Sequence, residues 1–229
     1  MPPTYLQNQP AGAQVVEPKF QLKEGGRGAV PDTLSAPELG FVLDRSGSMS
    51  SLVNEAVTGF NTLIDEQRSV APPANFSLEL FNNLTRLLYD ALPLSEVPPL
   101  SSAMYEPWGG TALNDAIGEM IQLIGRRAKR STRVLIAILT DGAENSSCKF
   151  FASDILSMVT YRRTTYDWQF VFIGPESALS YALSIGIPKS NVVSFNTDPA
   201  GMRSIMDRLS KSMRAYQLGD KRYALQLHN

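Results

Sequence analysis

The chain has 229 residues, 43% hydrophobic and 19% charged, a composition that suits one globular domain with a large core. The formal net charge of −1 gives no general attraction to nucleic acid or to an anionic membrane, so we expect neither as a partner. A single cysteine, Cys148, and a single histidine, His228, exclude a disulfide framework and a multi-cysteine zinc site, and they leave little for a histidine-based catalytic triad.

Residues 1–37 differ in composition from the remainder of the chain. They are rich in Pro, Gly and Gln and show no sustained apolar period, which predicts an extended or disordered N-terminal arm. An arm that docks on a neighbouring subunit is the alternative. The N-terminus lacks the basic start and apolar middle of a secretory signal, and no apolar run approaches the roughly 20 residues that span a bilayer. We therefore expect a cytoplasmic protein without membrane contact.

Residues 38–217 carry the alternating pattern of a single domain, and residues 218–229 are expected to form a C-terminal tail. Continuous or alternating apolar runs predict strands, and apolar residues at steps of three and four predict helices. In chain order we expect a strand at 39–44, a helix at 53–64, strands at 75–83 and 85–94, a helix at 113–124, a strand at 134–141, a helix at 150–163, a strand at 168–174, a helix at 176–185, a strand at 191–196 and a helix that begins at 198–199.

This order of elements predicts an α/β fold. Apolar strands that alternate with amphipathic helices indicate a doubly wound, mostly parallel central sheet with helices on both faces, as in Rossmann-like folds. The second and third strands follow each other directly and should form an antiparallel edge. Ligands of such sheets bind beyond the carboxyl ends of the strands, at the point where the strand order reverses.

Three loops of this pattern carry oxygen-bearing side chains. Asp44, Ser46 and Ser48 follow the first predicted strand, Asp141 lies at the end of the fourth, and Thr111 stands at the start of the second predicted helix. All three loops should open at the same edge of the sheet. Asp and Ser are also common helix caps, so each motif alone has a purely structural interpretation. The conjunction of the three loops favours a shared site.

Such a site would consist of oxygen ligands only. Two carboxylates and three hydroxyls suit a hard divalent cation, Mg²⁺ or alternatively Mn²⁺ or Ca²⁺. An ion that is held mainly by neutral hydroxyls would keep an affinity for a further carboxylate. We therefore expect a binding device that captures an Asp or Glu of a partner protein.

At these residues the sequence resembles the von Willebrand factor type A domain family. The resemblance rests on "DRSGSMS", "GGTAL" and "LTDGAENSS", in family order, and covers about residues 39–216. It implies a metal-ion-dependent adhesion site formed by Asp44, Ser46, Ser48, Thr111 and Asp141, with Mg²⁺, protein binding and no catalysis. The sequence looks closest to compact bacterial and phage-type single-domain members, and an associated AAA+ ATPase is a partner that the resemblance suggests.

Five further residues are expected on the rim of this site, where they would contact the partner. They are Arg45, Tyr105, Trp108, Gly110 and Glu144. Each has a structural alternative: a solvated arginine, aromatic rings packed on their own domain, a plain turn and a helix cap.

Two other functions remain open alongside the binding module. One is a structural or assembly protein that oligomerises through residues 1–37. The other is a Mg²⁺-dependent hydrolase or phosphotransferase. The sequence lacks both the phosphate-binding pattern G-x-x-x-x-G-K-[ST] and a plausible general base, so we expect no enzyme.

Overall fold

The computed structural model of the protein describes residues 35–70, 73–220 and 222–228. Most of the predicted N-terminal arm lies outside these residues. Strands and helices follow one another in the predicted order. The strands are β1 (Glu38–Asp44), β2 (Asn75–Phe81), β3 (Thr85–Pro93), β4 (Val134–Leu139), β5 (Gln169–Gly174) and β6 (Val192–Ser194), and the α-helices are α1 (Val53–Arg68), α2 (Leu113–Gly125), α3 (Ala152–Tyr166), α4 (Leu179–Ser184) and α5 (Pro199–Gln217).

The six strands form one sheet in the order β3-β2-β1-β4-β5-β6. β1 pairs in parallel with β2 and β4, and the pairs β4–β5 and β5–β6 are also parallel. β2 and β3 pair antiparallel, which makes β3 the antiparallel edge. The predicted doubly wound, mostly parallel sheet is therefore confirmed.

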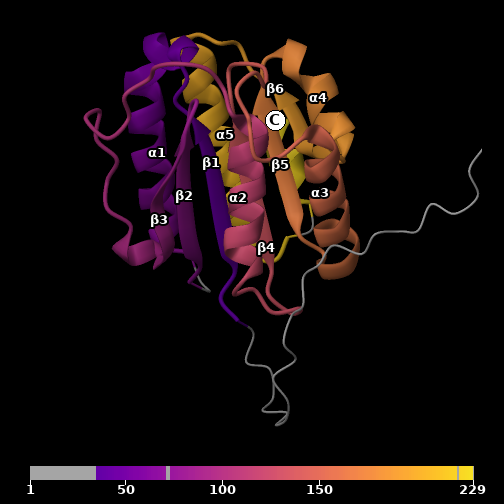
Figure 1. Ribbon diagram of the computed structural model, residues 1–229. Helices are drawn as coiled ribbons and strands as arrows, with labels where there is room; N and C mark the ends of the chain where they lie inside the picture. Colours follow the sequence, from indigo (N-terminus) through magenta and orange to yellow (C-terminus); the bar gives the residue numbers. More distant parts are fainter. Residues whose placement is uncertain (1–34, 71–72, 221, 229) are drawn as a thin grey trace, which may run out of the picture. The chain divides into compact units, whose positions relative to one another are not determined.

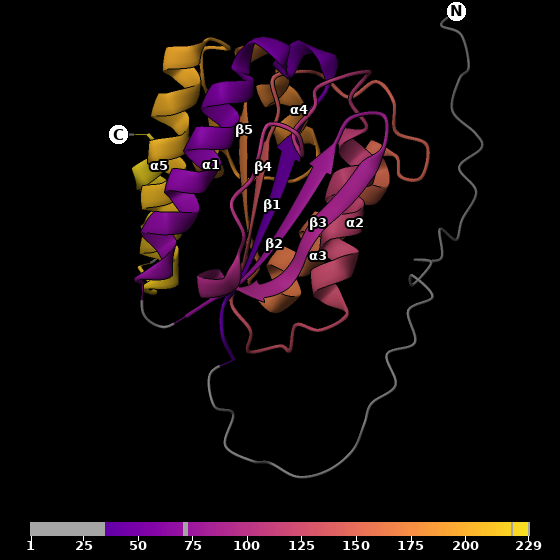
Figure 2. The ribbon, with the colours of Figure 1, turned by 90° about the vertical axis from the view of Figure 1, so that its left-hand side faces the viewer.

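Helices cover both faces of the sheet (Figure 1). Figure 2 shows α1 and α5 on one face and α2 and α3 on the other. Successive side chains of β1 point to opposite faces of the sheet and so contribute to the core on each face. Leu39, Phe41 and Leu43 belong to the core beneath α1 and α5, whereas Val42 belongs to the core beneath α2 and α3. β1 is buried along its whole length, as expected for a central parallel strand.

Aromatic packing holds α1 to the sheet. The ring of Phe60 stacks on Phe41 with centroids 6.3 Å apart, and its centroid lies 5.9 Å from that of Phe76. All three rings are fully buried, and each such burial stabilises the fold by about 1.5–3 kcal/mol. This packing holds the middle of α1 against the sheet.

The last helix begins as its sequence predicts. Asp198 is the N-cap and its Oδ1 accepts a hydrogen bond from the Gly201 amide at 2.7 Å, while Pro199 occupies the first helical position. The predicted apolar face of α5 is buried against the core; its members are Met202, Ile205, Met206, Leu209 and Met213.

The C-terminal segment is more than the tail that we expected from the sequence. A short 3₁₀ helix covers Tyr223–Leu227, and both Tyr223 and Leu227 are buried in the core beneath α5. The Nδ2 of Asn191 donates a hydrogen bond to the Tyr223 hydroxyl at 2.8 Å. This segment therefore completes the fold. None of the helices over the described residues is long and apolar enough to cross a membrane.

The topology creates a switch point between β1 and β4. From β1 the chain builds β2 and β3 on one side, and it later adds β4, β5 and β6 on the other. Asp44 is the last residue of β1, and Asp141 follows β4 after one intervening residue. Both predicted carboxylates therefore lie at the carboxyl ends of neighbouring parallel strands, where such sheets bind ligands.

Candidate metal centre

Asp44 is the buried centre of the site. Its side chain is fully buried, its Oδ1 accepts a hydrogen bond from the Ser46 amide at 2.6 Å, and its Oδ2 accepts one from the Thr140 hydroxyl at 2.5 Å. Burial raises the pKa of Asp44 to about 6, against the lowering effect of these donors. Among the described residues, no lysine or arginine forms an ion pair with Asp44.

Hydroxyl groups connect the loop after β1 with the loop after β4. The Oγ atoms of Ser46 and Ser48 lie 3.1 Å apart, and the Ser48 hydroxyl donates to Oδ1 of Asp141 at 2.6 Å. Ser46 is buried and Ser48 is exposed, so the row runs from the interior to the surface. Partial burial raises the pKa of Asp141 as well.

Thr111 joins this group from the segment that precedes α2. It is almost fully buried, and Asn145 clamps its backbone: the Asn145 Oδ1 accepts from the Thr111 amide at 2.8 Å, and the Asn145 amide donates to the Thr111 carbonyl at 3.0 Å. A Cβ added to Gly142 would lie 3.3 Å from the Thr111 Oγ1 and 3.8 Å from the Ser48 Oγ. The absence of a side chain at Gly142 keeps the space beside these two hydroxyls open.

The structure thus brings the five predicted ligand residues together through contacts between three loops. Their donor set of two carboxylates and three hydroxyls fits a hard divalent cation such as Mg²⁺, Mn²⁺ or Ca²⁺. In the part of the chain that the structure describes, no cluster of three or more His, Cys, Asp or Glu side chains is placed to hold a metal. A cation at this site would therefore rely on the hydroxyls.

Two of the predicted rim residues turn inward. Tyr105 is fully buried and its hydroxyl donates a hydrogen bond to the main-chain carbonyl of Asp44, so its predicted contact with a partner is wrong. Burial raises its pKa well above the usual range. Arg45 is 8% exposed, so the solvated arginine considered from the sequence is also wrong. Both residues lie within packed loops that the sequence alone could not orient.

The carboxylate oxygens of Glu144 accept hydrogen bonds from within the protein. Its carboxylate accepts from the amides of Asn114 (2.8 Å), Ser146 (3.0 Å) and Ser147 (2.9 Å). The carboxylate therefore binds the first turn of the preceding helix α2 and its own loop, and it does not cap the following helix, as the structural alternative had it. Its predicted contact with a partner stays a prediction.

Gly110 and Trp108 differ from the inward-facing residues. The Gly110 amide donates to the Oδ1 of Asn83, and a Cβ at Gly110 would lie 2.2 Å from the Ser146 hydroxyl oxygen, so a side chain here would displace Ser146. Trp108 is 48% exposed, and its amide donates to the Arg45 carbonyl at 3.1 Å. Trp108 therefore presents an exposed aromatic surface beside the candidate metal centre.

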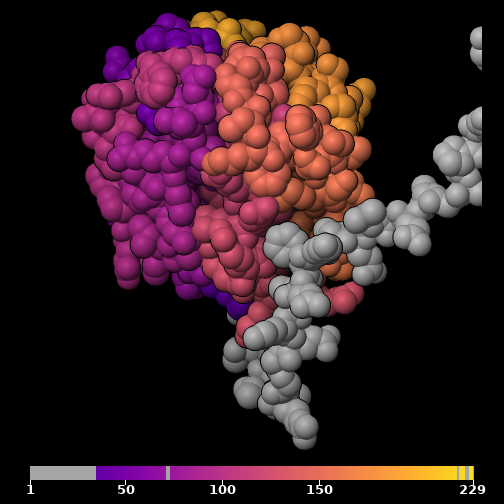
Figure 3. Space-filling view, viewed as in Figure 1, coloured from indigo at the N-terminus to yellow at the C-terminus, as the bar shows by residue number. Residues whose placement is uncertain are grey.

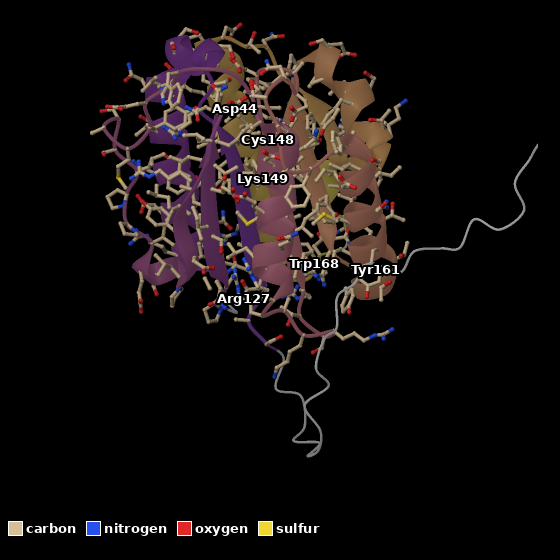
Figure 4. All side chains as sticks on the ribbon, viewed as in Figure 1. Asp44, Arg127, Cys148, Lys149, Tyr161 and Trp168 are labelled. Carbon is tan, nitrogen blue, oxygen red and sulfur yellow. The ribbon has the colours of Figure 1, made fainter. Side chains whose placement is uncertain are left out.

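Three residues outside the predicted ligand set hold the loops in place. Thr140 binds Asp44, Asn145 clamps Thr111, and Asn83 links the β2–β3 hairpin to Gly110 and to the Ser146 hydroxyl at 3.3 Å. Figure 3 shows the corresponding surfaces in contact, the purple hairpin beside the salmon loop after β4. The signal for Thr140 was present, because a polar residue follows directly on the apolar run of β4. Figure 4 shows Asp44 at the end of the sheet where these loops meet.

Comparison with known sequences identifies no relative: no protein-family model and no curated protein matches the chain. Solved structures do match its fold. A von Willebrand factor type A protein from Catenulispora acidiphila superposes with a TM-score of 0.55 and 18% identity, over 78% of this chain and 43% of that protein.

Two further matches are metal-loaded. Proximal thread matrix protein 1 from the mussel byssus, with a zinc-occupied MIDAS motif, gives a TM-score of 0.58 and 16% identity over 78% of this chain and 46% of that protein. The manganese-loaded TRAP protein of Plasmodium vivax gives a TM-score of 0.53 and 17% identity, over 73% of this chain and 70% of that protein. The chain thus spans less than half of the first two proteins. At these identities the matches establish the architecture: this chain has the von Willebrand factor type A fold.

Proposed function

We propose that the chain is a metal-ion-dependent protein-binding module. Asp44, Ser46, Ser48, Thr111 and Asp141 hold one divalent cation, Mg²⁺ or alternatively Mn²⁺ or Ca²⁺, and a carboxylate of a partner protein completes its coordination. The observation that carries this proposal is the fully buried Asp44, whose carboxylate receives only neutral donors from the described residues. A buried carboxylate without a positive partner is costly unless a cation is bound beside it.

The nature of the ligands favours capture of an external acid. Both oxygens of Asp44 already accept hydrogen bonds from the protein, and the three hydroxyls carry no charge. When bound, the ion supplies a Lewis-acidic centre that attracts carboxylates. Ser48 is exposed and Asp141 is half-buried, so a partner can reach this side of the site from solvent.

The structural neighbours support the metal part of the proposal. One has a zinc-occupied MIDAS motif and another is manganese-loaded. The partner that we expect is a cytoplasmic protein that presents Asp or Glu; an AAA+ ATPase and a second copy of this chain are alternatives. We propose no catalytic role.

The test is a calorimetric titration of the full-length protein with the capped peptide acetyl-Gly-Asp-Gly-amide in Mg²⁺ buffer. We expect weak binding that disappears when EDTA replaces Mg²⁺ and when Asp141 is replaced in Asp141→Ala. The matched peptide with Asn in place of Asp should not bind. Binding of the Asp peptide that persists in EDTA would contradict the proposal.

A further inference from the structure

Arg45 stands between two of the proposed ligands, and its main chain is fixed on both sides. Its amide donates to the Phe81 carbonyl at 2.7 Å, which extends the pairing of β1 with β2 by one residue. Its carbonyl accepts from the amide of Trp108 at 3.1 Å. The side chain is 8% exposed, so the protein encloses this arginine at the edge of the candidate metal centre.

The guanidinium of Arg45 has no partner within the described residues. Its Nε is buried without a hydrogen bond, and no carboxylate lies within ion-pair distance of the side chain. Two more exposed arginines are fully engaged by comparison. Arg127 pairs with Glu38 and Asp90, and Arg133 donates to two main-chain carbonyls at 2.9 Å. Burial of a charged group without a partner costs folding free energy, and at Arg45 this cost falls on the buried Nε.

The electrostatic surroundings of Arg45 favour an incoming anion. Arg86 on β3 adds a second positive charge that acts on the Arg45 guanidinium, and Glu106 acts on it with the opposite sign. Glu106 is exposed and does not form an ion pair with Arg45. A divalent cation beside Asp44 would make this region still more positive, which attracts acidic segments.

We propose that Arg45 is a second anion receptor, which binds a second carboxylate of the same partner segment whose first carboxylate binds the cation. The partner is therefore a segment with two closely spaced acidic residues. Arginine suits this role because its planar guanidinium binds a carboxylate through two parallel hydrogen bonds. This inference rests on the proposed function, because the cation defines where the first carboxylate binds.

The test uses a series of capped peptides, acetyl-Asp-(Gly)n-Asp-amide with zero to three glycines, and the matched series with Asn as the second acid. They are titrated calorimetrically into the full-length protein in Mg²⁺ buffer. We expect at least one spacing to bind about tenfold tighter with Asp than with Asn, as for a charge-assisted hydrogen bond. This difference should fall below about twofold in Arg45→Met and persist in the control Arg126→Met, which removes an exposed arginine at the C-terminal end of α2.

A thermal melt separates this role from a structural one. Met keeps the apolar stem of Arg45 and removes the unpaired charge, so Arg45→Met without metal or peptide should melt at the same temperature as the wild type or higher. A lower melting temperature would show that Arg45 stabilises the fold, and would overturn the inference.

The peptide results also separate the two proposals. Equal binding of the Asp and Asn peptides in Mg²⁺, with binding lost in EDTA, would overturn the role of Arg45 and leave the metal-dependent function in place. A second-acid advantage that persists in EDTA and is lost in Arg45→Met would support Arg45 and contradict the metal-dependent function. Absence of any peptide binding by the wild type would overturn both.

Discussion

Each end of β1 carries a buried carboxylate, and the two carboxylates differ in the charge of their hydrogen-bond donors. Glu38, at the amino end, is 5% exposed; its carboxylate pairs with Arg127 at 2.9 Å and accepts from Asn75 at 2.8 Å. Asp44, at the carboxyl end, is fully buried and receives only amide and hydroxyl donors. Figure 4 shows Asp44 and Arg127 at opposite ends of the sheet. At the amino end an arginine of the chain balances the buried carboxylate, whereas at the carboxyl end no lysine or arginine of the described residues pairs with it.

A third buried carboxyl group sharpens this comparison. Glu79 on β2 is 2% exposed, and burial, followed by the nearby Glu119, raises its pKa to about 9. Glu79 is thus neutralised by a proton at pH 7, and Glu38 by an arginine. Asp44, with a pKa of about 6, is ionised at pH 7 and has neither. Of these three residues, Asp44 is the one whose negative charge a bound metal ion would neutralise.

The largest expected effect is at the amino end. Arg127→Met removes the positive partner of the buried Glu38 and should lower the free energy of unfolding by about 3–5 kcal/mol, measured by urea denaturation. The control Arg126→Met should change it by less than about 0.5 kcal/mol, because Arg126 is exposed. Similar small losses in both variants would show that the amino end does not depend on this pair.

Metal should produce the next largest effect, at the carboxyl end. Mg²⁺ at a hundred times its dissociation constant should raise the free energy of unfolding of the wild type by about 2.7 kcal/mol, because only the folded chain assembles the site. Asp44→Asn should abolish this gain, and Arg127→Met should retain it. A gain that survives in Asp44→Asn would place the ion elsewhere.

The raised pKa of Glu79 predicts a smaller effect, in which the stability of the fold depends on pH. Its pKa in the folded chain, about 9, lies above the ordinary value of 4.5, so between these pH values the folded chain holds a proton that the unfolded chain has released. Stability therefore falls as pH rises through this window, by up to about 1.4 kcal/mol per pH unit from this group. Between pH 7 and 8 the metal-free wild type should lose more stability than Glu79→Gln. Parallel losses would contradict the assignment of a proton to Glu79.

The smallest expected effect concerns the loops of the metal centre. Asn145→Ala removes the 2.8 Å hydrogen bond to the Thr111 amide and should cost about 1 kcal/mol of stability. Because Thr111 then loses its fixed position, Mg²⁺ should bind about five- to tenfold more weakly by calorimetry. An unchanged dissociation constant would show that the clamp does not position Thr111.

The fold and the five ligand positions were predictable from the sequence for physical reasons. Strand and helix periods are local properties, and the rule that ligands gather at the carboxyl ends of parallel strands places loops without any knowledge of packing. Asp44 and Asp141 could be assigned to one edge of the sheet because each follows an apolar run. Hydrogen bonds join Asp44, Ser46, Ser48 and Asp141, and Asn145 ties Thr111 to the loop that carries Asp141. Metal binding by the five residues remains a prediction.

The orientation of the rim residues was not predictable in the same way. Tyr105 and Arg45 lie in segments without a regular period, so the sequence carries no signal for which side chain turns inward. Glu144 binds three amides, two of them within its own loop, and only the folded loop reveals that its acceptors are used. The hydrogen bond between Asn191 and Tyr223 likewise joins distant parts of the sequence, and no local pattern announces it.

The most direct test of the central claim is a titration of the metal-free, full-length protein with Mn²⁺, in which free Mn²⁺ is followed by its electron paramagnetic resonance signal. We predict one bound ion per chain in the wild type, and loss of that ion in Asp44→Asn and in Thr111→Val, with the circular dichroism spectrum of the fold retained. Absence of binding by the wild type, or undiminished binding by both variants, would contradict the claim that these residues form a metal centre.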